Sequence, residues 1–598
     1  MEQYIEKDKV RTMKDGVIIK RLLKYTKPFV WKFVFVLILM LFSVLIEVCT
    51  PLVIGEVIEL LGSDNIDINF IIFMVILYIV LVLLTYAGSY LQAVTLQKIG
   101  QNILYDIRTE IFTHIENLSI AQINKTPIGK FVTRVTNDTN TLNEMFTNSI
   151  VNLIRNFATL AFVLVAMFLK NWKLSLYILA VVPFIVAFTV LFKKVTRKAY
   201  RQVRTDISNM NAFLSENISG MKITQMFNQE NKQYNEFKNR NNRLRNSSLK
   251  QTITFGIFRP TMYLLYVVAV IIVIYFGSYE VMTNPAVAFS LVYVFYQFVS
   301  KLFNPIQQLA DQFNTIQSAF ASSERIFEIL DTQSDIIDKE DALEIEEFKG
   351  KIEFRNVWFA YVDEDWILKD VSFVINPKET VAFVGATGAG KTTILSLIVR
   401  NYDIQKGQIL IDDIDIKDIK LSSLRKNIGQ MLQDVFLFSG TIKSNIQMRE
   451  ESITDEEIYN ACEYVNANHF IEKLDKKYDE EVRERGNNFS SGQRQLLSFA
   501  RTIVHKPQIM ILDEATANID TETEVLIQES LEKMRNIGTM LIVAHRLSTI
   551  QHADKIVVLK HGEIQEIGNH QELLKKKGQY YELYQIQYQK KAITGREF

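Results

Sequence analysis

Apolar and polar residues are distributed very differently in the two halves of the chain. Residues 29–300 hold long apolar runs, whereas residues 350–590 mix short apolar stretches with polar ones, as a water-soluble α/β domain does. Each long run approaches the roughly 20 apolar residues that a helix needs to cross a bilayer. A buried core helix would explain any one run, but six in half the chain favour membrane spans. The predicted spans are residues 29–48, 70–90, about 150–169, 174–192, about 257–277 and about 284–304.

The links between the predicted spans indicate their orientation. Short links alternate with two long links that read as helical arms. The second arm, residues 193–250, holds 13 Lys and Arg, which predicts a cytoplasmic location. The outer links hold no Lys or Arg except Lys170 and Lys173. Both termini then lie in the cytoplasm, and residues 16–28 are predicted to form an amphipathic helix on the inner membrane surface. Pro183 is expected to kink the fourth span.

The soluble half contains a glycine-rich loop between a strand and a helix. The sequence TVAFVGATGAGKTTILSLI begins at Thr380 and fits the pattern G-x-x-x-x-G-K-[ST] in that context. Glycines allow consecutive backbone N–H groups to turn toward phosphate oxygens, and the helix start adds positive charge. Lys391 is expected to reach the β- and γ-phosphates of ATP, and Thr392 to bind Mg²⁺. The predicted nucleotide-binding residues here are Gly385, Ala386, Thr387, Gly388, Ala389, Gly390, Lys391, Thr392 and Thr393.

Two later apolar strands end in residues suited to phosphate chemistry. The stretch QIMILDEAT ends in Asp513 and Glu514. We expect Asp513 to hold Mg²⁺ through water and Glu514 to polarise the attacking water. The stretch LIVAHRLST places His545 at a strand end, where ligands bind in open α/β sheets, and predicts a γ-phosphate contact. A solvated turn and a structural histidine are the alternative readings.

Length, charge and cysteine content narrow the possibilities further. At 598 residues the chain is too long for one domain. The formal net charge is zero, so nothing indicates nucleic acid as a partner. Cys49 and Cys462 lie far apart and predict neither a disulfide framework nor a metal site. The charged first residues do not resemble a cleavable signal peptide.

These motifs together resemble a half-transporter of the ATP-binding cassette (ABC) exporter family, over nearly the whole chain. The resemblance implies an all-α six-helix transmembrane domain with long cytoplasmic helical extensions, followed by an α/β P-loop nucleotide-binding domain. It implies ATP and Mg²⁺ as ligands and a second half-transporter as partner. The expected domains are an amphipathic segment at 1–28, the transmembrane domain at 29–320, a linker at 321–350, the nucleotide-binding domain at 351–586 and a tail at 587–598.

The resemblance assigns roles to further residues. Tyr361 is similar to the aromatic that stacks on adenine. Gln433 resembles the glutamine that contacts Mg²⁺ and senses the membrane domain. The D-loop keeps Asp520 but replaces its usual opening serine with Ala517. The tips of the two arms resemble coupling loops that dock on nucleotide domains, and we expect them near residues 120–129 and 211–220.

The stretch FSSGQ at 489–493 resembles the family signature LSGGQ. In that family two nucleotide domains meet head to tail, so that each ATP lies between one P-loop and the partner's signature. Ser491 stands where glycine would allow close backbone approach. The residues expected to face the partner's ATP are Ser490, Ser491, Gly492 and Gln493.

The altered signature favours a heterodimer. The chain's own P-loop, Glu514 and His545 are intact, while the signature that it offers to a partner is not. We expect a partner that supplies LSGGQ and lacks the equivalent of Glu514, which gives one consensus and one degenerate ATP site. A homodimer that tolerates Ser491 is the alternative.

Charged and aromatic residues in the predicted spans are the candidate substrate contacts. Glu47 and Arg155 are charges at membrane depth and therefore candidate substrate contacts, although they could instead pair structurally. Aromatics in the sixth span suit amphipathic compounds, but packing against lipid or neighbouring helices is the preferred interpretation for any single one. The sequence predicts an ATPase that drives multidrug-type efflux of hydrophobic or amphipathic small molecules. Its expected location is the bacterial cell membrane, where it contacts lipids. The nucleotide-binding domain is expected on the cytoplasmic side. A dedicated lipid or peptide exporter is the alternative.

Overall fold

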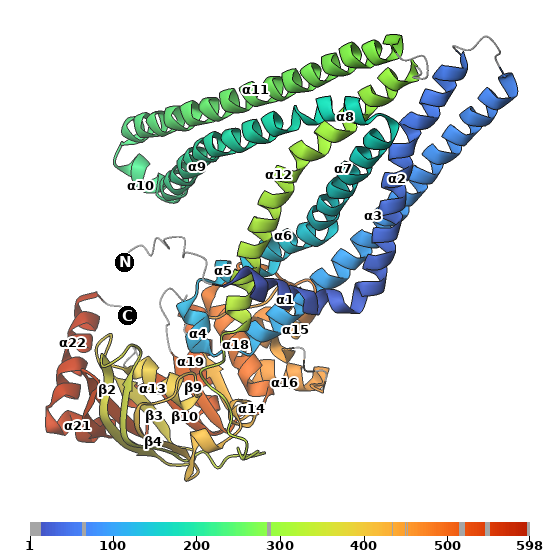
Figure 1. The fold of residues 1–598 in the computed structure, drawn as a ribbon. Coiled ribbons are helices and arrows are strands. Elements are labelled where there is room, and N and C mark those ends of the chain that lie inside the picture. The colour runs from blue at the N-terminus through green and yellow to red at the C-terminus, as the bar shows by residue number, and fades with distance from the viewer. Residues whose placement is uncertain are drawn as a thin grey trace. The chain divides into compact units, whose positions relative to one another are not determined.

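The computed structural model describes residues 13–61, 67–283, 289–432, 434–448, 450, 452–513, 521–543 and 550–594. The chain divides into two compact units (Figure 1). The first, which we call the helical unit, covers Met1–Glu116 and Ile128–Thr332. The second, which we call the sheet unit, covers Asn117–Pro127 and Gln333–Phe598.

Long helices carry the predicted membrane spans. Within the described residues, four helices are long and apolar enough to cross a membrane, and a shorter apolar stretch, Trp172–Ile185, covers α8 (Trp172–Leu179) and the start of α9 (Val182–Ser219). The helical first domain is therefore confirmed, while the number of six spans stays a prediction. The main helices of the unit are α1 (Asp15–Thr26), α2 (Val30–Leu61), α3 (Ile68–Glu116), α5 (Ile128–Thr133), α6 (Thr139–Glu144), α7 (Ile150–Lys170), α8 (Trp172–Leu179), α9 (Val182–Ser219), α10 (Met221–Met226), α11 (Glu230–Thr283) and α12 (Ser290–Leu330).

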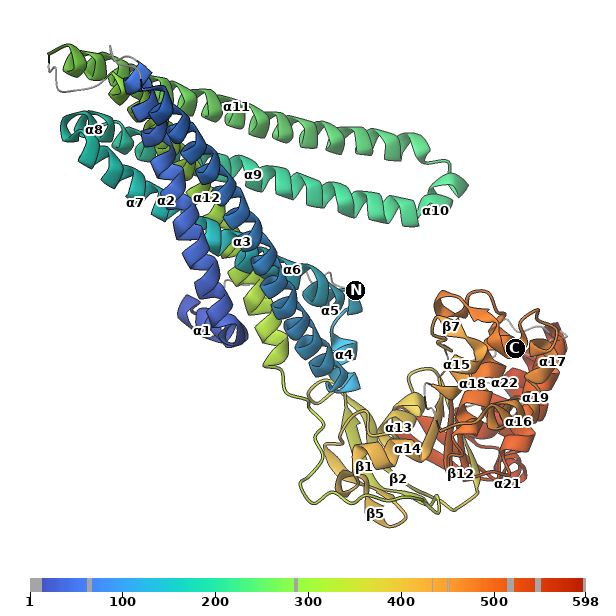
Figure 2. The ribbon, with the colours of Figure 1, turned by 90° about the vertical axis from the view of Figure 1, so that its right-hand side faces the viewer.

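The helices of this unit pack in two groups. Helices α3 and α7 each contact α2 and α12. An apolar cluster that includes Phe295 and Phe298 is built from α2, α7, α8, α9, α11 and α12. Helices α9 and α11 lie side by side and are joined by α10 (Figures 1 and 2). The fourth predicted span is interrupted between α8 and α9, and Pro183 lies in the first turn of α9, where its missing N–H costs little.

The amphipathic segment at the start of the chain is α1. Its residues Ile18 and Leu22 are buried against apolar side chains of the helical unit, while Val17 and Leu23 on the opposite side are exposed. The guanidinium of Arg21 donates to Asp331 at 2.6 Å. One apolar face therefore packs on protein, as the amphipathic pattern requires.

The two arm tips differ from each other. Helix α4 (Ile120–Lys125) lies in the sheet unit, where Gln122 Nε2 donates to the carbonyl of Gln333 at 2.7 Å. The second tip was predicted about ten residues too early. Helix α9 continues through residues 211–219, because nothing there stops a helix, and the turn falls at Gly220 and α10 instead.

The sheet unit contains a parallel sheet flanked by helices and a smaller antiparallel sheet. The strand orders are β12-β11-β3-β10-β9-β6, with β12 antiparallel, and β2-β1-β4-β5. The strands are β1 (Ile352–Ala360), β2 (Trp366–Ile375), β3 (Thr380–Val384), β4 (Lys406–Ile411), β5 (Ile414–Asp415), β6 (Ile428–Met431), β7 (Gly440–Thr441), β8 (Glu481–Val482), β9 (Ile509–Asp513), β10 (Thr539–Val543), β11 (Lys555–Lys560) and β12 (Glu563–Gly568). The helices are α13 (Lys391–Ile398), α14 (Leu421–Lys426), α15 (Ile442–Gln447), α16 (Asp455–Tyr464), α17 (Asn468–Ile471), α18 (Ser491–Val504), α19 (Thr521–Met534), α21 (His570–Lys576) and α22 (Gln579–Thr594).

The parallel sheet separates two apolar cores. Val381 and Phe383 of β3 face the core that also contains α13 and the antiparallel sheet. Ala382 and Val384 face the opposite core, which α16 and α18 cover. Because side chains alternate along a strand, a continuous apolar run is what a strand buried on both faces requires.

Candidate nucleotide-binding site

The glycine-rich loop follows the buried strand β3 and ends at the start of α13. Gly390 caps this helix with φ +100°, a left-handed conformation that side chains disfavour. At Gly385 a Cβ atom would lie 2.3 Å from the carbonyl oxygen of Leu559. The backbone therefore passes too close to its neighbours for larger residues, and the loop has the shape of a phosphate cradle at a helix N-terminus.

Lys391 closes the loop on itself. Its Nζ donates to the carbonyl oxygens of Gly385 at 2.8 Å and Ala386 at 3.0 Å. Burial lowers the pKa of Lys391, and the carboxylate of Asp513 acts in the opposite direction. A phosphate in the cradle would replace these carbonyl partners with charged oxygens, which bind an ammonium group more strongly. Thr392, the next residue, is exposed in the first turn of α13.

Tyr361 lies directly after β1 and contacts α13, the helix that follows the phosphate loop. Its hydroxyl is 3.1 Å from Oγ1 of Thr393, which is buried in α13. Burial raises the pKa of Tyr361, and the bond to Thr393 partly offsets this rise. The ring packs edge-on against Phe359 and Tyr402 and remains 42% exposed. A half-exposed ring fixed beside the loop is available for stacking on a base.

The ends of three neighbouring strands meet at this edge of the sheet. In the register, Phe383 of β3 pairs with Val543 of β10, and Val543 pairs with Asp513 of β9. Asp513 is therefore two strands away from the strand that feeds the phosphate loop, at the edge where ligands bind in such sheets. Four predicted site residues lie outside the described residues: Gln433, Glu514, Asp520 and His545.

The signature stretch forms the start of α18. Ser490 is its N-cap: Ser490 Oγ accepts from Gln493 N at 3.2 Å, and Ser490 N donates to Gln493 Oε1 at 3.0 Å. Ser490 and Gln493 therefore form a capping box at the start of this helix. Ser491 is the first helical residue and Gly492 is buried. Phe489 is also buried, in the core beside Phe470, so this ring serves packing.

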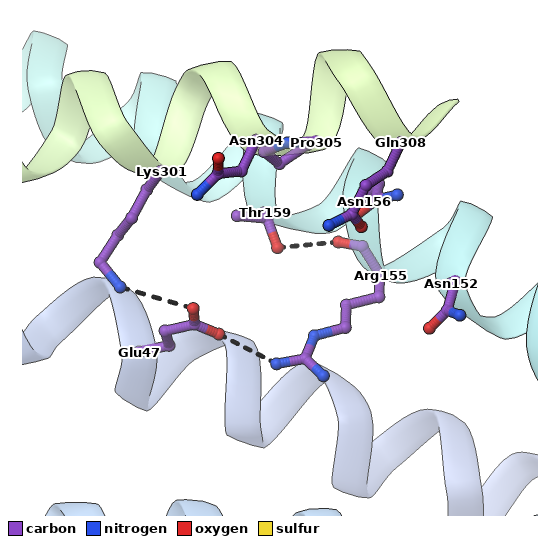
Figure 3. Close-up of a pocket in the computed structure, with 9 residues that line it drawn as sticks. All are labelled: Glu47, Asn152, Arg155, Asn156, Thr159, Lys301, Asn304, Pro305 and Gln308. Atoms are coloured by element: carbon purple, nitrogen blue, oxygen red, sulfur yellow. Dashed lines mark hydrogen bonds and ion pairs between the residues drawn. The ribbon is translucent and has the colours of Figure 1, made fainter. Parts of the chain in front are cut away.

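A second polar site lies in the helical unit between α2, α7 and α12 (Figure 3). Glu47 Oε2 accepts from Arg155 Nη2 at 3.1 Å, and Glu47 Oε1 accepts from Lys301 Nζ at 3.5 Å. The structure thus brings together the two charges singled out in the sequence. Lys301 and Asn156 were missed, although a lysine inside an apolar span is itself a signal. The cavity measures about 340 Å³ and is lined by Glu47, Asn152, Arg155, Asn156, Thr159, Lys301, Asn304, Pro305 and Gln308.

Comparison with known proteins identifies the family. A family model described as the ABC transporter transmembrane region matches residues 33–306, and one described as ABC transporter matches residues 368–517. A putative ABC transporter ATP-binding protein, exp8, of Streptococcus pneumoniae is 38% identical over 574 residues, covering 95% of this chain and 97% of that relative. The chain belongs to the ABC transporter family.

Other relatives of this ABC transporter carry more specific names. An ATP-dependent lipid A-core flippase of Syntrophus aciditrophicus is 34% identical over 581 residues, covering 96% of the chain and 95% of the relative. A probable multidrug resistance ABC transporter ATP-binding/permease protein, YheH, of Bacillus subtilis is 37% identical over 529 residues. The match covers 87% of this chain and 77% of that relative. The predicted identity is confirmed: this ABC transporter is an exporter-type half-transporter, with a membrane region and an ATPase domain coupled to transport fused in one chain.

Proposed function

We propose that this ABC half-transporter pairs with a second, different half-transporter and exports hydrophobic or amphipathic compounds across the cell membrane. The pair would contain one consensus and one degenerate ATP site. The observation that carries this proposal is the contrast between an intact phosphate loop, with Glu514 and His545 in the sequence, and a signature that has Ser491 in place of glycine. The chain would therefore contribute the catalytic half of one site and the altered signature of the other.

Ser491 matters because of its place in the helix. It is the first residue of α18, where helix N–H groups and positive partial charge are available to an anion. The extra Cβ and hydroxyl would keep a partner's phosphate farther from this backbone than glycine does. Ser490 already fixes the first turn through its bonds with Gln493, so the helix start has little freedom to adjust.

In the consensus site, each residue of this chain has a distinct task. Lys391 would transfer its hydrogen bonds from loop carbonyls to the β- and γ-phosphates. Thr392, Gln433 and Asp513 would hold Mg²⁺, with Asp513 acting through water, and the ion would neutralise charge on the phosphates. Glu514 would orient and polarise the attacking water, and His545 would contact the γ-phosphate.

The arm tip at α10 supports pairing with a second subunit. In the six-residue helix α10, Ile223 is 63% exposed and Met226 73% exposed, and Phe227, directly after the helix, is 70% exposed. Exposed apolar patches of this kind mark interaction sites. We assign this tip to the nucleotide domain of the partner half-transporter, because the other tip, α4, already packs within this chain's own sheet unit.

Charge placement supports the proposed orientation in the membrane. The arm at 193–250 is strongly basic, as cytoplasmic segments are. The two lysines in an outer link pair with acidic residues at the ends of other spans: Lys170 lies 3.6 Å from Glu56, and Lys173 lies 3.5 Å from Glu280. These lysines are partly neutralised, which reconciles them with an outer location.

The substrate class rests on the relatives and on the cavity. Relatives named as a lipid A-core flippase and as a multidrug resistance transporter both suggest amphipathic cargo. Glu47 and Arg155 line a cavity among membrane helices and are proposed substrate contacts. A dedicated lipid or peptide exporter, and a homodimer that tolerates Ser491, remain the competing proposals.

The deciding experiment is ATPase activity in lipid. The chain purified alone is compared with the chain co-purified with the product of a neighbouring transporter gene. We expect turnover only in the pair, and Glu514→Gln in this chain to lower it about a hundredfold or more. Substantial turnover by the chain alone would show a homodimer. Normal turnover in the Glu514→Gln pair would contradict the catalytic assignment.

A further inference from the structure

We propose that the cavity between α2, α7 and α12 binds the headgroup of an amphipathic substrate that carries one negative charge. This inference rests on the proposed export function and names the chemistry of its cargo. It applies to any single-charge anion, whether a sulfonate, a carboxylate or a phosphodiester, on a free compound or on a lipid.

The charge balance of the cavity is the first argument. Its lining contains one carboxylate, Glu47, and two cations, Arg155 and Lys301. Glu47 divides its two oxygens between the two cations (Figure 3), so among the described residues neither cation has an acidic partner of its own. The surplus of one positive charge lies beside α2 and α7, which belong to helices apolar enough to cross a membrane. An uncompensated charge is costly in such surroundings, and electrostatic attraction is strong.

Hydrogen-bond donors are also in excess. Asn156 is 6% exposed, and its Nδ2 has no hydrogen-bond partner among the described residues. Among the described residues, the guanidinium group of Arg155 forms a hydrogen bond through Nη2 alone, so its other N–H groups are available to a ligand. A buried donor without a partner costs free energy that an acceptor-rich ligand would recover. Anionic headgroups are such ligands, whereas a quaternary ammonium group accepts no hydrogen bonds.

The cavity is accessible and large enough to hold the headgroup of a ligand. The side chains of Arg155 and Glu47 are each 35% exposed and that of Lys301 is 21% exposed, so the cluster is not sealed inside the helices. A volume of about 340 Å³ falls in the range of ligand sites and exceeds the needs of a headgroup. Because the cavity is polar while the surrounding helices are apolar, an attached alkyl chain would lie against those helices.

Glu47 acts in this arrangement as a resident counter-ion. It compensates part of the positive charge when no substrate is bound, and an incoming anion competes with it for Arg155 and Lys301. This predicts opposite effects of neutralising the two signs of charge. A purely structural ion cluster predicts the same effect for all three residues, because each substitution breaks a contact between helices.

The test uses this chain together with its partner in phosphatidylcholine nanodiscs and three probes with the same alkyl chain: decanesulfonate, decyltrimethylammonium and decanol. Equilibrium binding of each radiolabelled probe is measured. We expect decanesulfonate to bind about tenfold more tightly than the other two. Arg155→Gln and Lys301→Gln should each weaken its binding about tenfold, and Glu47→Gln should strengthen it severalfold.

Two further variants keep the test decisive. Asn156→Asp leaves the three charged residues in place and should weaken sulfonate binding even if Arg155→Gln fails to fold. Lys170→Gln removes a lysine that pairs with Glu56 outside the cavity and should change nothing. Equal binding of the three probes, or weaker binding in Glu47→Gln, would overturn the inference.

A last arm identifies the source of the headgroup. Nanodiscs that include phosphatidylglycerol are compared with phosphatidylcholine alone. Competition by phosphatidylglycerol indicates a lipid headgroup, and no competition indicates a free anionic compound; both support an anion site. ATP hydrolysis by the pair and its loss in Glu514→Gln are measured in parallel. A pair that hydrolyses ATP normally but has no headgroup preference overturns this inference and leaves the proposed function standing.

Discussion

At the scale of single residues, Tyr361 joins the expected adenine contact to the phosphate loop. The ring is partly exposed, while the hydroxyl is fixed by Thr393 in the helix that follows the loop. The residue type was identifiable from the sequence by resemblance. Its bond to Thr393 and its contact with Tyr402 were not, because the three residues belong to separate stretches of chain.

Tyr361 yields a prediction that separates ring from hydroxyl. Tyr361→Ala should weaken ATP binding by about 1–3 kcal/mol, the contribution of stacking a base on an aromatic ring. Tyr361→Phe keeps the ring, loses the bond to Thr393 and should bind ATP almost normally. ATP affinity measured by calorimetry checks both variants. An equal loss of ATP affinity in both variants would show that the hydroxyl group, rather than the ring, supports ATP binding.

Cys462 provides a prediction on pH. The side chain is fully buried in α16, and burial raises the pKa of its thiol to about 12. At about pH 8 the folded protein then holds the thiolate in about one molecule in ten thousand. In a Cys49→Ser background, maleimide should not modify Cys462 until the protein is unfolded.

The raised pKa also sets the direction of a stability effect. The folded state retains the proton more tightly than the unfolded chain, so this stabilising contribution is complete below about pH 9 and is lost as the pH rises toward about 12. Rapid labelling of native protein at about pH 8 would contradict the burial of Cys462 and indicate opening of the helices around α16.

At the scale of elements, capping boxes define where helices begin in the sheet unit. Ser490 and Gln493 start α18, and Thr454 and Glu457 start α16 with the same pattern of bonds. The capping box gives the signature serine a structural role in addition to the proposed ATP contact. The capping role and the proposed ATP contact can be tested separately, because α16 has the same capping box but is not part of the signature.

A matched pair of substitutions tests this separation. Ser490→Ala and Thr454→Ala should each destabilise the protein by about 1 kcal/mol, since each removes one N-cap. Only Ser490→Ala should also change the ATPase activity of the pair. Thermal unfolding and ATP turnover are measured on both. Equal turnover in the two variants would indicate that Ser490 serves the helix alone.

The position of the turn at the second arm tip could not be predicted from the sequence. The helical periodicity of residues 193–250 predicted an arm, but the position of its turn depends on Gly220 and on how α9 and α11 pack together. Likewise, the kink expected at Pro183 is a break between two helices, α8 and α9. Turns and breaks depend on packing between helices as well as on local sequence.

At the scale of the whole molecule, Ser491→Gly discriminates between the two forms of dimer. In a heterodimer whose partner lacks the equivalent of Glu514, restoring glycine improves a site that has no catalytic base, and turnover should not change. In a homodimer the same substitution repairs both sites, and turnover should rise about tenfold or more. Steady-state ATPase activity decides, with Ser491→Ala as a control for loss of the hydroxyl.

The sequence by itself determined the features whose chemistry is local. The phosphate loop, the acidic pair at the end of β9, the altered signature and the apolar helices each occupy a continuous stretch, because backbone shape and hydrophobic periodicity are set by neighbouring residues. These were sufficient to predict the family and the two-part architecture.

Only the tertiary structure decided which distant residues share a site. Glu47 meets Arg155 across 108 positions and Lys301 across 254. Helix α4 joins the sheet unit although its neighbours in sequence belong to the helical unit. Such pairings depend on how whole helices pack, and no local pattern encodes them. The charge surplus of the membrane cavity, which carries the inference on substrate, therefore emerged only when three helices had been brought together.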